Sequence, residues 1–138
     1  MDGCPHCAGI NEDHLWRGPL YRVVLVSQPG FPGWCRVIWN THVGEYTDLS
    51  ESERAQFMHA VAPVEEALRA ELKPAKINLA SLGTAMPHLH MHVIPRFPDD
   101  PNFPDPVWLP PVRSTHRALP ADFGDAVRAR LVVLDLVR

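Results

Sequence analysis

Short hydrophobic runs with strand character occupy the first third of the chain, and one long segment with helical spacing follows them. Residues 20–27 are rich in β-branched residues and end at a Gln-Pro-Gly turn, and residues 34–40 form a second run of the same kind. Because only a short turn separates these runs, they predict an antiparallel hairpin. Ser50 and Glu53 then form a capping box, which predicts a helix from this point to about Leu72.

Two further strand-like segments and a helical tail complete the pattern. Residues 76–82 form an apolar run that ends at Gly83, and residues 88–96 alternate histidine with apolar side chains. Residues 122–138 place apolar side chains on one side, which predicts a C-terminal helix. Strands, then a helix, then more strands predict an α+β domain in which helices pack on one face of an antiparallel sheet. A length of 138 residues suits a single domain, 1–138.

Composition narrows the classes of function. Hydrophobic residues make up 46% of the chain and charged residues 21%, as is typical of a soluble globular protein. The net charge of −3, with 13 basic residues spread along the chain, argues against nucleic-acid binding. The chain has no apolar run near the roughly 20 residues that span a bilayer, and its start is neither basic nor apolar, unlike a signal peptide. We therefore expect a cytoplasmic protein without a membrane or nucleic-acid partner.

Prolines are concentrated late in the chain. The sequence holds 15 of them, and seven lie between residues 95 and 111. Because each proline removes a backbone donor, this stretch cannot be regular structure, and we expect an extended arm over about residues 97–119. The arm carries Phe97, Phe103 and Trp108, which gives it aromatic surface to bury. Its own core, a second subunit and a ligand are all candidates for that surface.

Three histidines alternate with apolar residues in the segment 88–96. In a strand, alternate side chains share a face, so His88, His90 and His92 are expected to point one way, about 6–7 Å apart. A neutral imidazole near pH 7 is both a nucleophile and a proton carrier, and neighbouring imidazoles can hold phosphate oxygens. The row therefore suits phosphoryl or nucleotidyl transfer through a phospho-imidazole. It also suits metal binding, and the row alone does not decide between them.

The segment His88 to Ile94 resembles the His-φ-His-φ-His-φ-φ signature of the histidine-triad (HIT) family, where φ is apolar. The resemblance covers about residues 4–110. It includes the second strand up to a histidine, the helix from Ser50, the strand around Asn78 and an N-terminal cysteine pair. It implies a HIT-like α+β fold with an antiparallel sheet of about five strands, a long helix and a C-terminal helix. It also implies a homodimer that hydrolyses or transfers nucleotides, including dinucleoside polyphosphates and nucleoside phosphoramidates.

The resemblance also implies roles for individual residues. His90 would attack the α-phosphorus to give a nucleotidyl-histidine, and His92 would hydrogen-bond the reacting phosphate. Contacts to the substrate would come from His88, Thr84, Asn78 and Trp108. The sequence departs from the family pattern in two places. Trp34 replaces a histidine that usually follows Pro-Gly, and Thr84-Ala85 replaces the usual Gln-Ser/Thr ahead of the triad.

Cys4 and Cys7 form a C-x-x-C pair, the tightest chelating spacing for zinc and also the spacing of a redox pair. In bacterial histidine-triad members that bind zinc, the second-strand histidine and the first triad histidine complete the pair. Here those residues are His42 and His88, which implies a closed, structural Cys2His2 zinc site. The other histidines are expected at the surface and Cys35 in the core; these histidines are His6, His14, His59 and His116.

Three rival interpretations remain open at this point. The altered loop at Thr84-Ala85 leaves room for a nucleotide-binding module, stabilised by zinc, with little turnover. The three triad histidines are candidates for facial ligands in a metalloenzyme, although positions i, i+2 and i+4 of a strand spread apart. Cys4 and Cys7 are candidates for a thiol-disulfide role.

Overall fold

The computed structural model describes residues 3–136 of the chain. Its helices and strands follow one another in the order expected from the sequence, with a short helix and a strand added before the predicted hairpin. The elements are α1 (Pro5–Ala8), β1 (Asp13–Arg17), β2 (Tyr21–Leu25), β3 (Cys35–Trp39), a 3-10 turn (Tyr46–Asp48), α2 (Glu51–Leu72), β4 (Lys76–Ala80), β5 (His90–Arg96), α3 (Phe123–Leu131) and a 3-10 turn (Val132–Leu136).

All five strands form one antiparallel sheet in the order β1-β2-β3-β5-β4. The predicted hairpin is confirmed as β2 and β3, with Tyr21 opposite Trp39 and Leu25 opposite Cys35. Strand β1 was not predicted. It pairs with β2 at the edge of the sheet and contains a register shift between His14 and Trp16, which interrupts the period of two that marks a strand.

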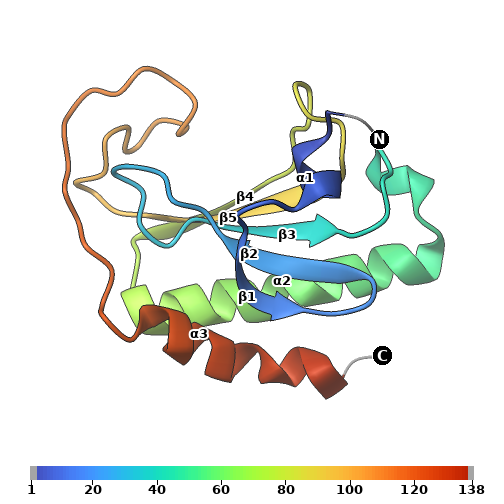
Figure 1. The fold of residues 1–138 in the computed structure, drawn as a ribbon. Coiled ribbons are helices and arrows are strands. Elements are labelled where there is room, and N and C mark those ends of the chain that lie inside the picture. The colour runs from blue at the N-terminus through green and yellow to red at the C-terminus, as the bar shows by residue number, and fades with distance from the viewer. Residues whose placement is uncertain (1–2, 137–138) are drawn as a thin grey trace.

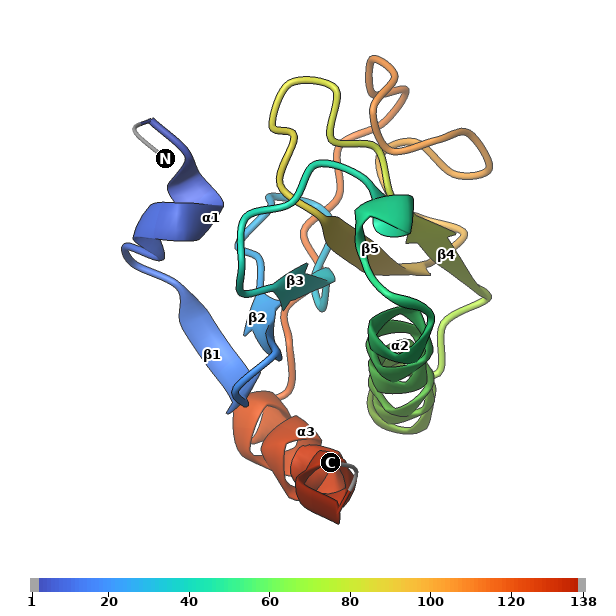
Figure 2. The same cartoon turned by 90° about the vertical axis from the view of Figure 1, so that its right-hand side faces the viewer.

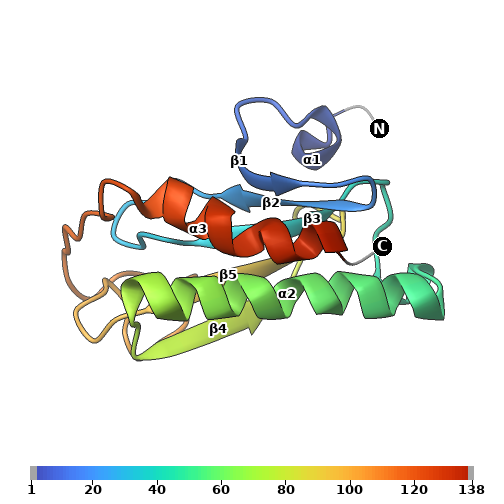
Figure 3. The same ribbon diagram turned by 90° about the horizontal axis from the view of Figure 1, so that it is seen from below.

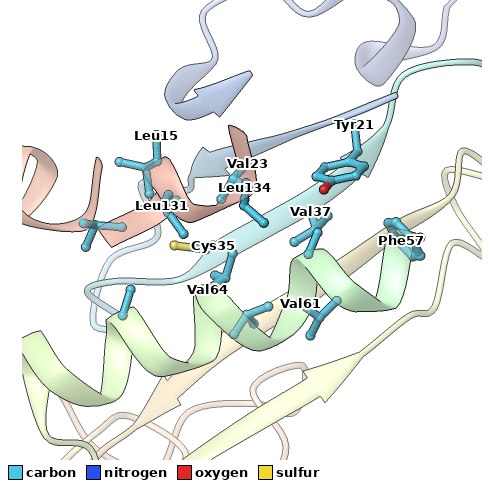
Figure 4. Packing of buried hydrophobic residues seen from close by; sticks show 14 of the residues in the cluster. Leu15, Tyr21, Val23, Cys35, Val37, Phe57, Val61, Val64, Leu131 and Leu134 are labelled. Atoms are coloured by element: carbon cyan, nitrogen blue, oxygen red, sulfur yellow. The ribbon is translucent and has the colours of Figure 1, made fainter. Parts of the chain in front are cut away.

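Helices α2 and α3 lie side by side across one face of the sheet, as Figures 1 and 3 show. Ser50 caps α2 as predicted: its side chain accepts from the Glu53 backbone N–H, and the Glu53 carboxylate accepts from the Ser50 N–H. Between helices and sheet lies the main core, seen in Figure 4, in which Phe57 and Val64 of α2 meet strand residues such as Val37. Each fully buried aliphatic or aromatic side chain of this kind contributes about 1.5–3 kcal/mol.

The opposite face of the sheet carries the polar residues that matter for function. Arg36 of β3 is paired with His92 of β5, and Ile38 is paired with His90, so these side chains share a face. Helix α1 lies on this side, away from α2 and α3 (Figures 1 and 2). We call this side the open face.

Two expectations about element ends need correction. Strand β5 begins at His90 and not at His88, which lies in the loop before it. The predicted alternation therefore holds for His90 and His92 only. The C-terminal helix α3 ends at Leu131 and continues as a 3-10 turn to Leu136, and the last two residues of the predicted 122–138 segment lie outside the described residues.

The arm expected over about residues 97–119 contains neither helix nor strand in the structure. It packs against the β2–β3 loop, and the two segments together line a cavity of about 800 Å³. Within residues 3–136, no helix is long and apolar enough to cross a membrane.

Candidate functional site

His90 and His92 form the centre of the candidate site. Both are buried on β5, and their ring centroids lie 4.8 Å apart in an edge-to-face arrangement. His90 Nδ1 lies 2.6 Å from the backbone oxygen of His88. Because a carbonyl oxygen can only accept, Nδ1 must carry the proton and donate it, which leaves a lone pair on Nε2 of a neutral His90.

Trp34 fixes His92 in the opposite tautomer. The indole Nε1–H of Trp34 donates to His92 Nδ1 at 3.0 Å. An indole nitrogen is a donor only, so Nδ1 of His92 must be unprotonated and Nε2 of a neutral His92 must carry the proton. The residue that departs from the family pattern thus contacts the triad directly. With both tautomers fixed, His90 presents a lone pair on Nε2, and the neighbouring His92 presents an N–H donor on its own Nε2.

Burial keeps both rings neutral. It lowers the pKa of His90 below its ordinary value, and the charge of Arg36 acts in the same direction, against the hydrogen bond to the His88 carbonyl. Burial likewise lowers the pKa of His92 to about 3, with further contributions from His90 and Arg36. An imidazole is neutral above its pKa, so at pH 7 both side chains are in the form that a nucleophile and a neutral donor require.

His88 belongs to a second cluster, together with Cys4, Cys7 and His42. The four ligand atoms lie within 4.8 Å of one another. His88 Nδ1 lies 3.3 Å from Cys4 Sγ, 3.5 Å from Cys7 Sγ and 3.2 Å from His42 Nδ1. A tetrahedral zinc with bonds of about 2.0–2.1 Å to nitrogen and 2.3 Å to sulfur has edges of about 3.3–3.6 Å from a nitrogen ligand to the other ligands. The donor set and its spacing therefore fit a metal ion.

The environment of His88 also suits a metal ligand. Its Nε2–H donates to the backbone oxygen of Trp39 at 2.6 Å, so Nδ1 keeps its lone pair and faces the cysteines. The three triad histidines do not converge on one ion. The Nδ1 atoms of His90 and His92 are engaged by a carbonyl and an indole, and the ring of His88 belongs to the cysteine cluster.

His6 is a site residue that the sequence did not predict. It was expected at the surface, but its side chain is only 4% exposed. Its ring centroid lies 4.7 Å from that of His90 and 5.5 Å from that of His88. One signal in the sequence could have indicated this position. His6 lies between Cys4 and Cys7, so any contact of these cysteines with His88 also brings His6 close to the triad.

An aromatic wall lies beside His92. Trp108 of the arm is half exposed, and its ring centroid lies 5.3 Å from that of His92 and 5.8 Å from that of Trp34. Phe31 completes the wall at 5.9 Å from Trp34. The predicted contact of Trp108 with a substrate stays a prediction, and its position next to His92 is compatible with that role.

The predicted substrate contacts also include His88, Asn78 and Thr84, and His88 is buried with its ring between the cysteine pair and the Trp39 carbonyl. Asn78 and Trp108 line a cavity of about 590 Å³ along β4, and Asn78 Oδ1 accepts a hydrogen bond from Arg96 at 2.8 Å. Thr84 is exposed in the loop 81–89. The structure thus places Asn78 in a side-chain network with Arg96, and Thr84 on the surface ahead of His88.

Comparisons with known proteins agree with this geometry. The family model of the HIT domain matches residues 9–99. The AP-4-A phosphorylase of Mycobacterium tuberculosis (strain CDC 1551 / Oshkosh) is 33% identical over 93 residues, which cover 63% of this chain and 48% of that protein. The chain therefore spans about half the length of the curated relatives it matches.

Solved structures show the same fold. The structure of a histidine triad protein from Bradyrhizobium japonicum superposes with a TM-score of 0.74 at 27% identity, covering 90% of this chain and 93% of that one. A Zn-bound histidine triad family protein from Mycobacterium smegmatis superposes with a TM-score of 0.67 at 23% identity, covering 99% and 98%. The α+β fold class and the family resemblance expected from the sequence are confirmed.

Proposed function

The chain belongs to the histidine-triad (HIT domain) family, and on this basis we propose that it is a nucleotide hydrolase or nucleotidyl transferase in which His90 attacks an α-phosphorus. The observation that carries the proposal is the hydrogen bond from His90 Nδ1 to the His88 carbonyl. It holds the ring in one orientation and leaves the lone pair of Nε2 for attack. A dinucleoside polyphosphate or a nucleoside phosphoramidate is the substrate class, in keeping with the name of the 33%-identical relative.

The reaction proceeds in two displacements. Nε2 of His90 forms a bond to the α-phosphorus while the bond from phosphorus to the leaving oxygen or nitrogen breaks, and a leaving nitrogen takes up a proton from water as it departs. The Nε2–H of His92 donates to an oxygen of the same phosphate, where negative charge is concentrated in the transition state. Water or another acceptor then attacks the phosphorus, the phosphorus–nitrogen bond breaks, and neutral His90 is regenerated. Because Trp34 holds the tautomer of His92, the donor is in place before the substrate binds.

Mass spectrometry of the intact protein tests the proposal directly. We expect a nucleotidyl adduct when the protein is quenched during turnover of diadenosine tetraphosphate or adenosine phosphoramidate. The adduct should be absent in His90→Ala and present in His59→Ala, because His59 is exposed on α2, which packs on the other face of the sheet. An adduct that persists in His90→Ala would refute the assignment. No adduct and no turnover with retained nucleotide binding would indicate the binding module instead.

We further propose that Cys4, Cys7, His42 and His88 hold a structural zinc ion, a proposal supported by their spacing and by the existence of a Zn-bound protein of the same fold. All four ligands come from the protein, so the shell has no open position, and the ion would tie the N-terminal segment to the loop ahead of β5. Metal analysis by mass spectrometry should find about one zinc per chain, lost in Cys7→Ser and kept in Cys35→Ala. Equal zinc in the parent and Cys7→Ser would refute the site. Cys35 is a matched control because it is buried in the main core.

A homodimer and a cytoplasmic location complete the proposal. Strand β4 is an edge of the sheet, and Leu79 on it and Leu82 just after it are exposed, which leaves an apolar edge for a second copy. Light scattering after gel filtration should give twice the mass of one chain. Leu79→Asp should shift it toward one, and Val132→Asp, at an exposed position beyond α3, should not. A cytoplasmic location is in keeping with the metal site, because a reducing compartment keeps the two cysteines as free thiols.

A further inference from the structure

Arg36 differs from the other arginines that lie partly or fully buried near the open face. Arg22 pairs with Glu12 at 2.7 Å, and Arg96 pairs with Asp100 at 2.7 Å. Arg36 is half-buried and forms no salt bridge with any residue in the described range 3–136. Its Nε atom is buried and has no hydrogen-bond partner there either.

Arg36 is a half-buried cation whose Nε is buried without a hydrogen-bond partner among the described residues, and this arrangement calls for an explanation. Burial lowers the pKa of the Arg36 guanidinium below its ordinary value, with the charge of Glu12 opposing the shift. Guanidinium groups in proteins nevertheless stay protonated, so the positive charge persists. A buried polar group without a partner is destabilising, and a charged one is more so. An anion that binds beside Arg36 would remove this cost, and a charge-assisted bond to a guanidinium is among the strongest hydrogen bonds available.

The position of Arg36 points to the reacting phosphate as that anion. Arg36 lies directly across from His92 in the β3–β5 register, and its charge acts on both His92 and His90. Next to the His90 ring, His6 has a second unpartnered atom: its Nε2 is buried without a hydrogen bond to any described residue. Two unpartnered nitrogen atoms thus belong to side chains next to the catalytic imidazoles.

We propose that Arg36 is a phosphate-binding residue of this site. Its guanidinium binds non-bridging oxygens of the phosphate that reacts at His90, and His6 adds a second N–H donor from its Nε2. The inference rests on the proposed nucleotidyl transfer and deepens it. It explains how the chain binds phosphate although Thr84-Ala85 lacks the amide and one hydroxyl of the usual loop. With Arg36 in this role, the site binds a nucleoside phosphate more tightly than the nucleoside without a phosphate.

Calorimetric binding of adenosine 5′-monophosphate and of adenosine, neither of which needs turnover, tests the inference. Arg36→Met keeps the length of the side chain and removes its charge. We expect this variant to bind the monophosphate at least about 10-fold more weakly, a change of about 1.4 kcal/mol. The affinity for adenosine should stay within about twofold. Arg69→Met, at an exposed position on α2, is the matched control and should bind both ligands as the parent does.

The outcomes separate this inference from the proposed function. An equal loss for both ligands, or no loss for the monophosphate, overturns the role of Arg36, as does a parent that binds both equally. If Arg36→Met does not fold, Arg36→Lys keeps the charge without the two-pronged donor, and unchanged affinity for the monophosphate then overturns the inference. A parent that binds the monophosphate through Arg36 and forms no adduct refutes nucleotidyl transfer alone. If the adduct forms but Arg36→Met binds the monophosphate as tightly as the parent, this inference alone is refuted.

Discussion

Replacing Asp100 with asparagine tests how the arm that carries Trp108 is anchored. Asp100 and Arg96 form an ion pair in which the side chains are 2% and 3% exposed. Asp100 also accepts from the backbone N–H groups of Asn102 at 3.0 Å and Phe103 at 2.6 Å, at the start of the arm. Arg96 in turn donates to the backbone oxygen of Asp105 at 2.7 Å. The pair therefore holds the arm to the end of β5.

The expected cost of Asp100→Asn follows from this burial. The substitution leaves the guanidinium of Arg96 buried without a counter-charge, and breaking a buried pair in this way costs about 3–5 kcal/mol. A domain of this size has a free energy of unfolding of about 5–15 kcal/mol, so the loss is a large part of the total. With the usual entropy of unfolding per residue, the melting temperature should fall by about 10–17 °C.

The pH dependence gives a second, independent signature. Burial alone would raise the pKa of Asp100, but the hydrogen bonds from Arg96 and from the backbone N–H groups of Asn102 and Phe97 outweigh it and hold the pKa below its ordinary value. A depressed pKa stabilises the folded state fully above the pKa of the unfolded chain, about 3.9. This contribution is lost as the pH falls through the pKa of the folded state. The parent should lose it below about pH 4, and Asp100→Asn should show a flatter profile there.

Urea unfolding followed by tryptophan fluorescence, at pH 7 and through the acid range, measures both effects. Asp99→Asn is the matched control, because the Asp99 carboxylate is 58% exposed in its pair with Arg117, and its loss should change the midpoint little. A midpoint for Asp100→Asn equal to that of the control would refute the anchoring argument. An acid profile for Asp100→Asn that coincides with the parent's would refute the pKa argument.

Three further outcomes follow from the site. Trp34→Phe keeps an aromatic ring but loses the N–H that fixes His92, so kcat in steady-state assays should fall about 10-fold, with a smaller change in KM. Trp108→Ala should raise KM more than it lowers kcat and leave the melting temperature near that of the parent, because the ring is 50% exposed. A chelator should lower the melting temperature of the parent and leave that of Cys7→Ser unchanged, as seen by calorimetry; equal shifts in both would contradict a metal held by Cys7.

Much of the fold could be predicted because its signals are local. Ser50 and Glu53 define the start of α2 by hydrogen bonds within one turn, and the β2–β3 hairpin is specified by two apolar runs around a short turn. Strand β1 could not be predicted in the same way. It is an edge strand with a polar sequence and a register shift, so it depends on pairing with β2 and gives no alternating pattern of its own.

The candidate site was predictable only where it follows one strand. His90 and His92 share a face by the strand period, and the structure places them together. His88 departs from that period because its ring turns to the cysteine cluster, a contact between residues 84 positions apart. His6 and Arg36 depend on how α1 and β3 meet the triad. The pattern of a single segment holds no information on such contacts. The prediction that His6 lies at the surface was therefore wrong.

Strand β3 and Trp34 just before it present side chains to two different environments. Cys35, Val37 and Trp39 pack into the core on one side, while Trp34 and Arg36 face His92 on the other. Because the two sets alternate, a substitution at Arg36 changes the surface beside His92 without repacking the helices on the other face, whereas one at Trp34 also disturbs its packing on Phe31 and Ile94. The chemistry offered to a ligand at position 36 can therefore be changed with little effect on the main core, which makes this position a starting point for laboratory evolution of new specificity.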